Sequence, residues 1–263
     1  MVTNSVNLGF RSELKSSMDA ARMAYRAGDF NLCAKHFRKT IDIAESNGLD
    51  GAITGEALIY LSICCSARKE FHEAETLLSK ALSVNEGDPQ CDKVLLALNY
   101  HEFSVLYWKT ERESESRAMN EKAFMALDQS QSDVAELRIM MLRQKAVLLA
   151  ASKDFKKADA VLETALNICL GSSELGKNCL AYGETLITKV FVCIDSGRLQ
   201  EARELYYQAI QITEMCLGVH HPKMADLYEL FANHVKGVSN EQATEFFRKK
   251  SKEIRDWIKK SKW

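Results

Sequence analysis

Cysteine and histidine side chains late in the chain are the residue types that could bind a metal ion. Cys216, His220 and His221 lie close together, but no fourth ligand stands at the spacing of a structural zinc site. We interpret them as a cluster at a helix end. Cys64 and Cys65 are neighbours and point to different faces of one helix, which indicates packing. The sequence predicts neither a metal site nor a cofactor.

Motifs that would supply catalysis are missing from the sequence. There is no Gly-rich phosphate loop, no G-x-S-x-G nucleophile elbow and no H-E-x-x-H pair. The carboxylates are spread over outward helix faces, and we interpret the run from Glu111 to Glu121 as one such solvated face. No catalytic residue is predicted, and we do not expect an enzyme.

Five short phrases divide the chain at nearly equal intervals. They are Gly28-Asp29-Phe30, Lys69-Glu70-Phe71, Glu111-Arg112-Glu113, Lys153-Asp154-Phe155 and Gly197-Arg198-Leu199. Their first residues are 41, 42, 42 and 44 positions apart, and a sixth phrase, starting at Val238, follows after 41 more. Periods between about 20 and 50 residues indicate a solenoid, in which each repeat is covered by its neighbours. Nearly the whole chain therefore belongs to one array.

The repeats are expected to be helical throughout. The chain has only two prolines and twelve glycines, and both residues weaken helix interiors. In the first repeat, apolar residues between Leu14 and Ala27 follow the spacing of one helix face. Gly28 then supplies a left-handed stop, and Asp29 caps the next helix. Each phrase is therefore predicted to be the turn between two antiparallel helices.

This pattern resembles the tetratricopeptide repeat. The resemblance rests on apolar residues before each phrase, on the aromatic residue that closes it, and on the small and bulky residues that alternate after it. The residues that carry it are Phe30, Cys33, Phe37 and Thr40; Leu61, Cys65, Phe71, Ala74, Leu78 and Ala81; Tyr100, Phe103, Ser104, Tyr107, Ser116 and Ala123; Leu149, Phe155, Ala158, Leu162 and Ala165; and Cys193, Leu199, Ala202, Tyr206 and Ala209. The small residues allow two helices to cross closely.

The repeat is longer than the usual period of about 34 residues, so each helix is expected to gain about one turn, roughly 5 Å. This length is similar to the long variant found in kinesin light chains. The junction from Leu217 to Pro222 adds to the resemblance, because an LG, two residues, HP sequence before a helix is typical of that group. Pro222 suits the first turn of a helix. The resemblance implies an all-α solenoid of six helix pairs in a right-handed superhelix.

We expect one solenoid domain over residues 13–263, after an N-terminal extension of residues 1–12. Its helix pairs are expected at 13–50, 52–90, 92–130, 132–172, 178–219 and 221–260. The sequence shows neither an apolar run long enough to span a bilayer nor a signal-peptide pattern at its start. Eight cysteines without paired spacing indicate a reducing compartment. These features predict a cytoplasmic protein.

In tetratricopeptide arrays the first helices of successive repeats line a concave groove. The resemblance implies that the groove residues here are Lys15, Met18, Arg22, Tyr25, Ile59, Ile63, His101, Val105, Trp108, Lys109, Met140, Arg143, Val147, Ile187, Phe191, Ile194 and Tyr228. Trp108 and Tyr228 are the expected anchors, because large aromatic side chains dominate truncation costs at interfaces. Two alternatives are that the register is shifted by one residue, or that the chain's own ends fill the groove.

Such a groove suits an amphipathic helix or an extended apolar peptide with some acidic residues. We therefore expect a non-enzymatic adaptor or scaffold for protein–protein interaction. One alternative is a fixed subunit of a larger assembly, and another is a peptide-sensing regulatory protein.

Some members of the family bind a chaperone's terminal carboxylate with a basic clamp. Lys15 matches one clamp position, but Asp19 and Tyr60 replace the expected asparagines, so this partner is not predicted.

The tail from Arg248 to Trp263 carries eight Lys or Arg against Glu253 and Asp256, a net charge of +6. The whole chain has a net charge of −1, so residues 1–247 carry −7. We interpret the tail as a solvated capping helix, with a weak contact to an anionic surface as the alternative. Basic and aromatic residues do not alternate elsewhere, so no nucleic-acid partner is expected.

Overall fold

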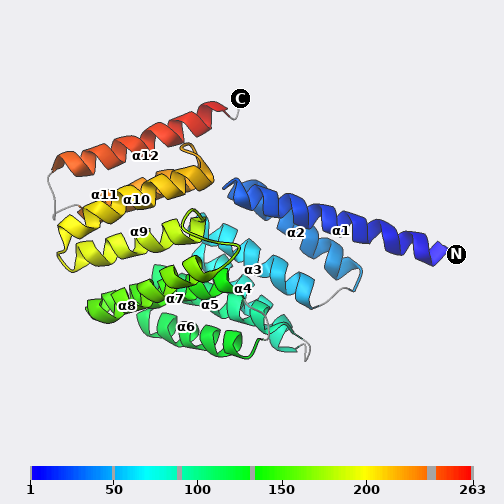
Figure 1. Ribbon diagram of the computed structural model, residues 1–263. Coiled ribbons are helices and arrows are strands. Elements are labelled where there is room, and N and C mark those ends of the chain that lie inside the picture. The colour runs from blue at the N-terminus through cyan, green and yellow to red at the C-terminus, as the bar shows by residue number, and fades with distance from the viewer. Residues whose placement is uncertain (1, 49–50, 88–90, 131–133, 236–240, 262–263) are drawn as a thin grey trace. The chain divides into compact units, whose positions relative to one another are not determined.

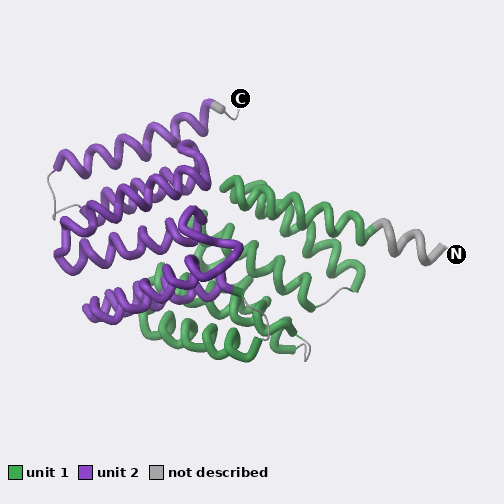
Figure 2. The backbone as a smooth tube through the Cα atoms, in the orientation of Figure 1, with its two compact units in different colours: residues 1–134 green, residues 135–263 purple. Residues whose placement is uncertain are grey.

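A computed structural model describes residues 2–48, 51–87, 91–130, 134–235 and 241–261. Every regular element in these ranges is an α-helix, which confirms the predicted all-α fold. The chain divides into two compact units, residues 1–134 and residues 135–263 (Figure 2). A right-handed superhelix of all six helix pairs stays a prediction.

Each unit holds three helix pairs whose members pack side by side (Figure 1). The pairs of unit 1 are α1 (Val2–Arg26) with α2 (Phe30–Ser46), α3 (Ala52–Ala67) with α4 (Phe71–Gly87), and α5 (Lys93–Lys109) with α6 (Glu113–Asp128). Those of unit 2 are α7 (Ala135–Ala151) with α8 (Phe155–Gly171), α9 (Leu180–Asp195) with α10 (Leu199–Leu217), and α11 (Pro222–Val235) with α12 (Glu241–Ser261). Helix α1 begins before the predicted start near Leu14, and residues 2–13 contain no proline that would prevent this.

The five turn phrases share one backbone geometry. Their first residues all have a left-handed φ: Gly28 70°, Lys69 65°, Glu111 61°, Lys153 62° and Gly197 80°. The second residue of each phrase donates its N–H to the carbonyl five positions earlier over 2.8–3.0 Å, and the first donates to the carbonyl three positions earlier. These two bonds form the Schellman closure of a helix end. The turns are therefore confirmed at every phrase in the described residues, whereas the sixth phrase lies outside them.

Side chains add to the turn closure at some of the phrases. The Asp29 carboxylate accepts a hydrogen bond from the Leu32 N–H over 3.1 Å, which confirms it as an N-cap. Asp154 does the same for Lys157 N–H over 3.3 Å. Pro222 is the first residue of α11, where no backbone donor is needed.

The small residues of the repeat pattern lie where the two helices of a pair cross. Cys33, Thr40, Ala74, Ala81, Ser116, Ala123, Ala158, Ala165, Ala202 and Ala209 are all buried. In the third pair, the Ser104 hydroxyl donates to the Ser116 carbonyl over 2.8 Å, and the Ser116 hydroxyl donates to the Ser104 carbonyl over 2.7 Å. This reciprocal bond gives the third pair, whose turn is charged, the same close crossing as the others.

Two glycines in equivalent positions mark the closest approach between paired helices. A Cβ on Gly55 would lie 2.2 Å from Asn85 Oδ1, and a Cβ on Gly183 would lie 3.0 Å from Thr213 Oγ1. The amide group of Asn85 is buried without a hydrogen-bond partner in the described part of the chain. Gly55 is therefore required because Asn85 fills the space next to it.

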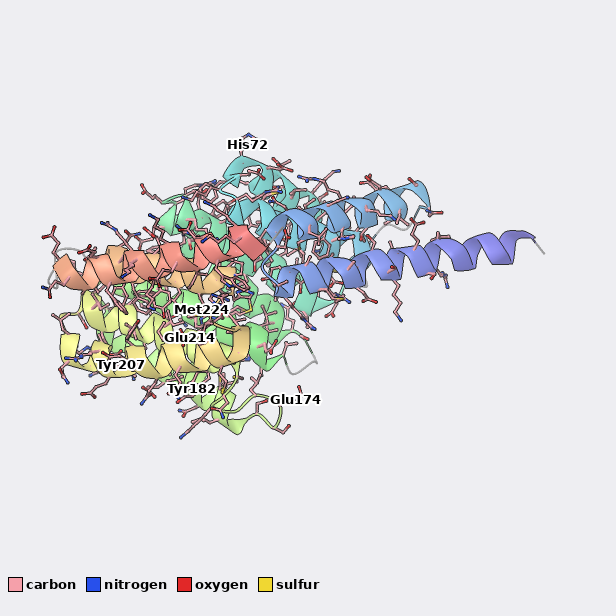
Figure 3. All side chains as sticks on the ribbon, turned by 90° about the horizontal axis from the view of Figure 1, so that it is seen from above. His72, Glu174, Tyr182, Tyr207, Glu214 and Met224 are labelled. Atoms are coloured by element: carbon pink, nitrogen blue, oxygen red, sulfur yellow. The ribbon has the colours of Figure 1, made fainter. Side chains whose placement is uncertain are left out.

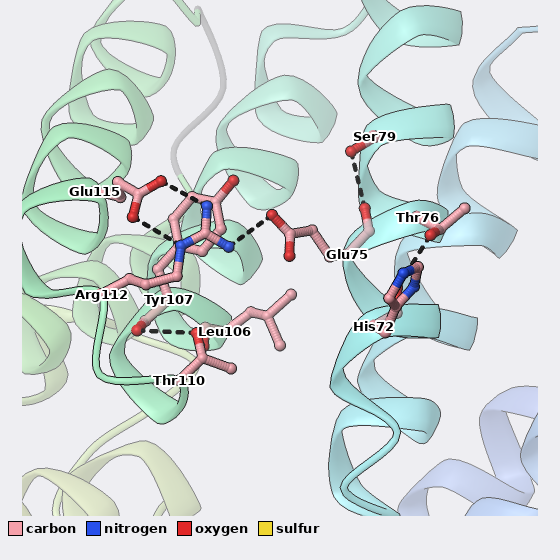
Figure 4. Close-up of polar contacts among 9 residues, drawn as sticks. All are labelled: His72, Glu75, Thr76, Ser79, Leu106, Tyr107, Thr110, Arg112 and Glu115. Atoms are coloured by element: carbon pink, nitrogen blue, oxygen red, sulfur yellow. Dashed lines mark hydrogen bonds and ion pairs between the residues drawn. The ribbon is translucent and has the colours of Figure 1, made fainter.

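Arginines in two turns connect the third and the fifth helix pair to the pair before it. Arg112 follows α5 and contacts Glu75 of α4 over 2.7 Å and Glu115 of α6 over 2.5 Å, and its guanidinium stacks over the Tyr107 ring (Figure 4). Arg198 follows α9 and contacts Asp159 of α8 over 2.8 Å. These arginines occupy equivalent positions in the third and fifth pairs. Each arginine thus joins the turn of its own pair to the second helix of the preceding pair, α4 or α8.

Glycine at the three non-glycine left-handed positions should stabilise the fold. Each of Lys69→Gly, Glu111→Gly and Lys153→Gly removes the Cβ conflict of a left-handed residue, so we expect a gain of about 0.5–1 kcal/mol. Chemical denaturation of each variant measures this gain. Lys69→Ala is the control and should gain little, because it keeps a Cβ. Loss of stability in all three glycine variants would contradict the shared geometry.

The Gly55 and Asn85 contact predicts strong coupling between two substitutions. Gly55→Ala should lower the free energy of unfolding by about 1–3 kcal/mol, because the new methyl group overlaps the buried amide. Gly55→Ala combined with Asn85→Ala should recover that loss and gain up to about 1 kcal/mol from helix propensity. A double-mutant cycle by urea denaturation tests this. Additive effects would show that the two side chains do not compete for space.

Candidate functional site

The first helices of unit 1, α1, α3 and α5, are joined side to side by their side chains. Arg22 Nη2 donates to Glu56 Oε1 over 2.7 Å and links α1 to α3. One turn later on the same helices, the rings of Tyr25 and Tyr60 meet edge to face with centroids 5.7 Å apart. At the other end, the Lys109 ammonium of α5 donates to Ser66 Oγ of α3 over 3.0 Å. We call this surface the unit 1 face.

Glu102 lies in the middle of the unit 1 face. It precedes Lys109 by seven residues, or about two helical turns, so both project from the same side of α5. Tyr60 and Glu102 each stand nine residues before the left-handed residue of their turn phrase, Lys69 or Glu111, which places them at equivalent positions on α3 and α5. Consistent with this position, the Glu102 charge helps burial to raise the pKa of Tyr25.

The carboxyl group of Glu102 is poorly compensated. The side chain is half-buried, and within the described residues it has neither a hydrogen bond nor an ion pair. Burial raises the pKa of Glu102 to about 7, and Lys109 offsets this only in part. At neutral pH this site therefore exchanges between a neutral acid and a carboxylate.

The first helices of unit 2, α7, α9 and α11, carry a cluster of opposite character. The guanidinium of Arg143 on α7 and the ammonium of Lys223 on α11 both contact the carboxylate of Glu184 on α9. The Glu184 side chain is 13% exposed and that of Arg143 24%, so the contacts are largely shielded from water. Two cations share one carboxylate. We call this surface the unit 2 face.

The cations of the unit 2 face are not fully satisfied by Glu184. Arg143 Nε is buried without a hydrogen-bond partner in the part of the chain that the structure describes. Burial lowers the pKa of Arg143 to about 10, and burial together with Arg143 lowers that of Lys223 to about 8. The contacts with Glu184 act in the opposite direction and favour the charged forms. An added carboxylate or carbonyl oxygen would supply the missing acceptor.

The predicted groove residues fall into two groups. Those at least partly exposed are Lys15, Arg22, Tyr25, Ile63, Val105, Trp108, Lys109, Met140, Arg143, Val147 and Phe191. Those buried in the cores are Met18, Ile59, His101, Ile187, Ile194 and Tyr228. Tyr228 is 6% exposed, and its hydroxyl donates to Glu214 over 3.1 Å, so it packs within unit 2 and offers little surface for the predicted anchoring role.

For two of the buried residues, both in unit 1, the next position along the helix is the partly exposed one. Ile59 and His101 face the core of unit 1, while the residues after them, Tyr60 and Glu102, lie on the unit 1 face. Sequence reasoning also missed Glu184 and Lys223. A charged residue inside an otherwise apolar helix was the available signal for Glu102 and Glu184.

The cysteine and histidine cluster near residue 216 is not assembled as one site. The Cys216 thiol donates to the Asn178 carbonyl over 3.3 Å, His220 stacks on Trp257 with ring centroids 4.1 Å apart, and His221 Nδ1 accepts from the Lys223 N–H. All eight cysteines are free thiols. Cys65, Glu70 and Glu73 come close enough to share an ion, but the Arg68 guanidinium already contacts Cys65 and Glu70.

Helix α12 is amphipathic and contains most of the basic tail. Ile254 is buried, and Phe247 and Ile258 pack against the unit 2 core, while the cations from Arg248 to Lys260 are exposed. Lys262 and Trp263 lie outside the described residues. Within those residues, none of the helices has both the length and the hydropathy needed to cross a membrane.

Comparisons with known proteins agree with this architecture. Residues 14–87 and 194–223 match models of the tetratricopeptide repeat. No curated protein matches the chain.

Several solved structures are similar in fold. BtubC (BKLC) from P. vanneervenii has 15% identity and a TM-score of 0.56, with 95% of this chain and 92% of that chain covered. A putative kinesin light chain from Podosopora anserina has 17% identity and a TM-score of 0.52, covering 77% and 96%. A Rap protein complexed with competence and sporulation factor has 11% identity and a TM-score of 0.69, covering 98% and 80%. Residues 14–87 and 194–223 therefore match the tetratricopeptide repeat, and the turn geometry and buried small residues recur in the other described helix pairs, in a fold similar to that of the solved kinesin light chain repeats.

Proposed function

We propose that this protein is a non-enzymatic adaptor or scaffold that binds a peptide or a partner helix on the first helices of its pairs. The observation that carries the proposal is the unit 2 face, where Arg143 and Lys223 share the single carboxylate of Glu184. A buried donor without a partner is unfavourable, because it has lost water without gaining an acceptor. Binding of an acceptor from another chain would remove this cost.

The side chains around the cluster define the ligand class. Met140 and Val147 on α7 and Phe191 on α9 are partly exposed. A segment with apolar residues and an acidic residue would cover the apolar side chains and pair with the Arg143 guanidinium. Charge-assisted hydrogen bonds from a guanidinium to a carboxylate are among the stronger ones in proteins. An amphipathic helix or an extended peptide has this composition.

The comparisons support an interaction role. Tetratricopeptide repeats act mainly as interaction modules, and the similar Rap protein was solved with a bound factor. A peptide-sensing regulatory role on the same face is a variant of this proposal. The eight free thiols support action in the cytoplasm, since that compartment is reducing.

A fixed subunit of a larger assembly is the second candidate, and it rests on the outer helices of unit 2. Tyr207 of α10, labelled in Figure 3, is 60% exposed, Phe246 of α12 is 50% exposed, and Trp257 is 47% exposed. Large exposed side chains beside a basic helix suit a permanent contact with an acidic partner. In that case the outer helices of unit 2, and not its first helices, would carry the function.

Affinity capture from the native cell separates these candidates. The tagged wild-type chain is compared with Trp108→Ala, Arg143→Glu and Tyr207→Ala by quantitative mass spectrometry. Lys35→Glu on the exposed side of α2, outside both candidate surfaces, is the charge-reversal control. We expect Arg143→Glu to reduce partner recovery about tenfold or more, while Lys35→Glu leaves it unchanged. Thermal melting of each variant checks that it is folded.

Two outcomes would overturn the adaptor proposal. Equal recovery by wild type and Arg143→Glu would show that the unit 2 face does not bind the partner. Loss of the same partners with Tyr207→Ala alone would favour the fixed subunit instead.

A further inference from the structure

The unit 1 face presents a carboxyl group without a cation next to two aromatic rings. Tyr60 stacks on Phe37 with ring centroids 5.4 Å apart, and Tyr25 meets both Tyr60 and Phe30 edge to face. Glu102 stands on α5 at the position equivalent to that of Tyr60 on α3. The Glu102 side chain is half-buried, and this burial is the main cause of its raised pKa. The result is an acidic position with aromatic walls.

The charged neighbours of Glu102 leave it without a counter-ion. Arg22 on α1 is already paired with Glu56 on α3. Lys109, on α5 itself, donates to Ser66 and lies two turns away. Tyr25 and Tyr60 are the other titratable groups on this face, and no group of α4 or α6 within the described residues shifts the pKa of Glu102.

A cation from another molecule would fit this position better than any group in the described chain. An ammonium or guanidinium next to the carboxylate would be attracted by it more strongly than it is repelled by Lys109 two turns away, since Coulomb energy falls with distance. The tyrosine rings add attraction for a cation above their faces. An anionic ligand would be repelled both by the carboxylate and by the negative faces of the same rings.

We propose that the unit 1 face is a subsite for a cationic side chain, a lysine or an arginine of the bound segment, held between Tyr25 and Glu102 and next to Tyr60. This inference rests on the proposed function, because it assigns one residue class of the ligand that the first helices bind. This cationic residue of the ligand is distinct from the acidic residue that the unit 2 face is proposed to bind.

Small probes test the subsite without knowledge of the partner. The full chain, with its tyrosine ring protons assigned through Tyr25→Phe and Tyr60→Phe, is titrated by NMR with n-butylammonium or n-butylguanidinium chloride. Sodium pentanoate is the anionic probe, and n-pentanol is the neutral one. We expect the cationic probes to shift the Tyr25 and Tyr60 signals in a saturable manner, and the other two probes to shift them at least tenfold less at equal concentration.

The variant Glu102→Gln separates charge from shape. It should abolish saturable binding of the cationic probes, while Glu121→Gln on the exposed side of α6 should bind like wild type. Because the pKa of Glu102 is about 7, about 10% of the group is ionised at pH 6 and about 90% at pH 8, so affinity should rise about ninefold between them. Glu102→Gln should remove this dependence.

Thermal melting shows whether a Glu102→Gln variant that has lost binding is still folded. A carboxyl group with a raised pKa in the folded state loses its stabilising contribution as pH rises from about 4.5 to about 7, so Glu102→Gln should melt higher than wild type at pH 8, and this difference should shrink as the pH falls and vanish below about pH 4. A folded variant that binds the cationic probes like wild type overturns the subsite. That result leaves the Arg143→Glu capture experiment unaffected, so the two proposals fail separately.

Discussion

The reversal of the chain at a left-handed residue is the constraint on which the rest of the structure depends. At each of the five described phrases, two backbone hydrogen bonds close the first helix around a residue with φ between 61° and 80°. Three of these residues are Lys69, Glu111 and Lys153, which carry a Cβ in a region that disfavours it. Packing of the two helices outweighs this local cost in every case.

The closed turn sets where the small residues must stand. Because the second helix starts directly after the left-handed residue, its first inward positions meet the first helix at close range, and Ala74, Ala158 and Ala202 are buried there. Gly55 and Gly183 extend the close approach along the first helix. Arg112 and Arg198 then use the turn itself to reach the preceding pair. Turn, crossing and neighbour contact are thus parts of one geometry.

The sequence predicted the features that recur in every repeat, but not the surface residues or the contacts between residues far apart in the chain. Turn positions, helix pairs and buried small residues recur with the period, so each repeat supports the prediction from the others. The surface residues do not recur. Tyr60 and Glu102 differ from the predicted Ile59 and His101 by one position, about 100° around a helix. The contact between Glu184 and Lys223 joins residues 39 apart, and no periodic pattern encodes it.

Under the proposed function, the two faces would let a chain with a net charge of −1 select its partner. Charge is balanced over the whole sequence, yet among the described residues the unit 2 face has two cations for one carboxylate and the unit 1 face has a carboxyl group with no paired cation. Both imbalances lie in partly desolvated positions, where electrostatic discrimination is strongest. A uniformly acidic segment would be accepted by one face and rejected by the other, and so would a uniformly basic one. Selection by these faces therefore depends on where each charge stands in the partner and not on the partner's total charge.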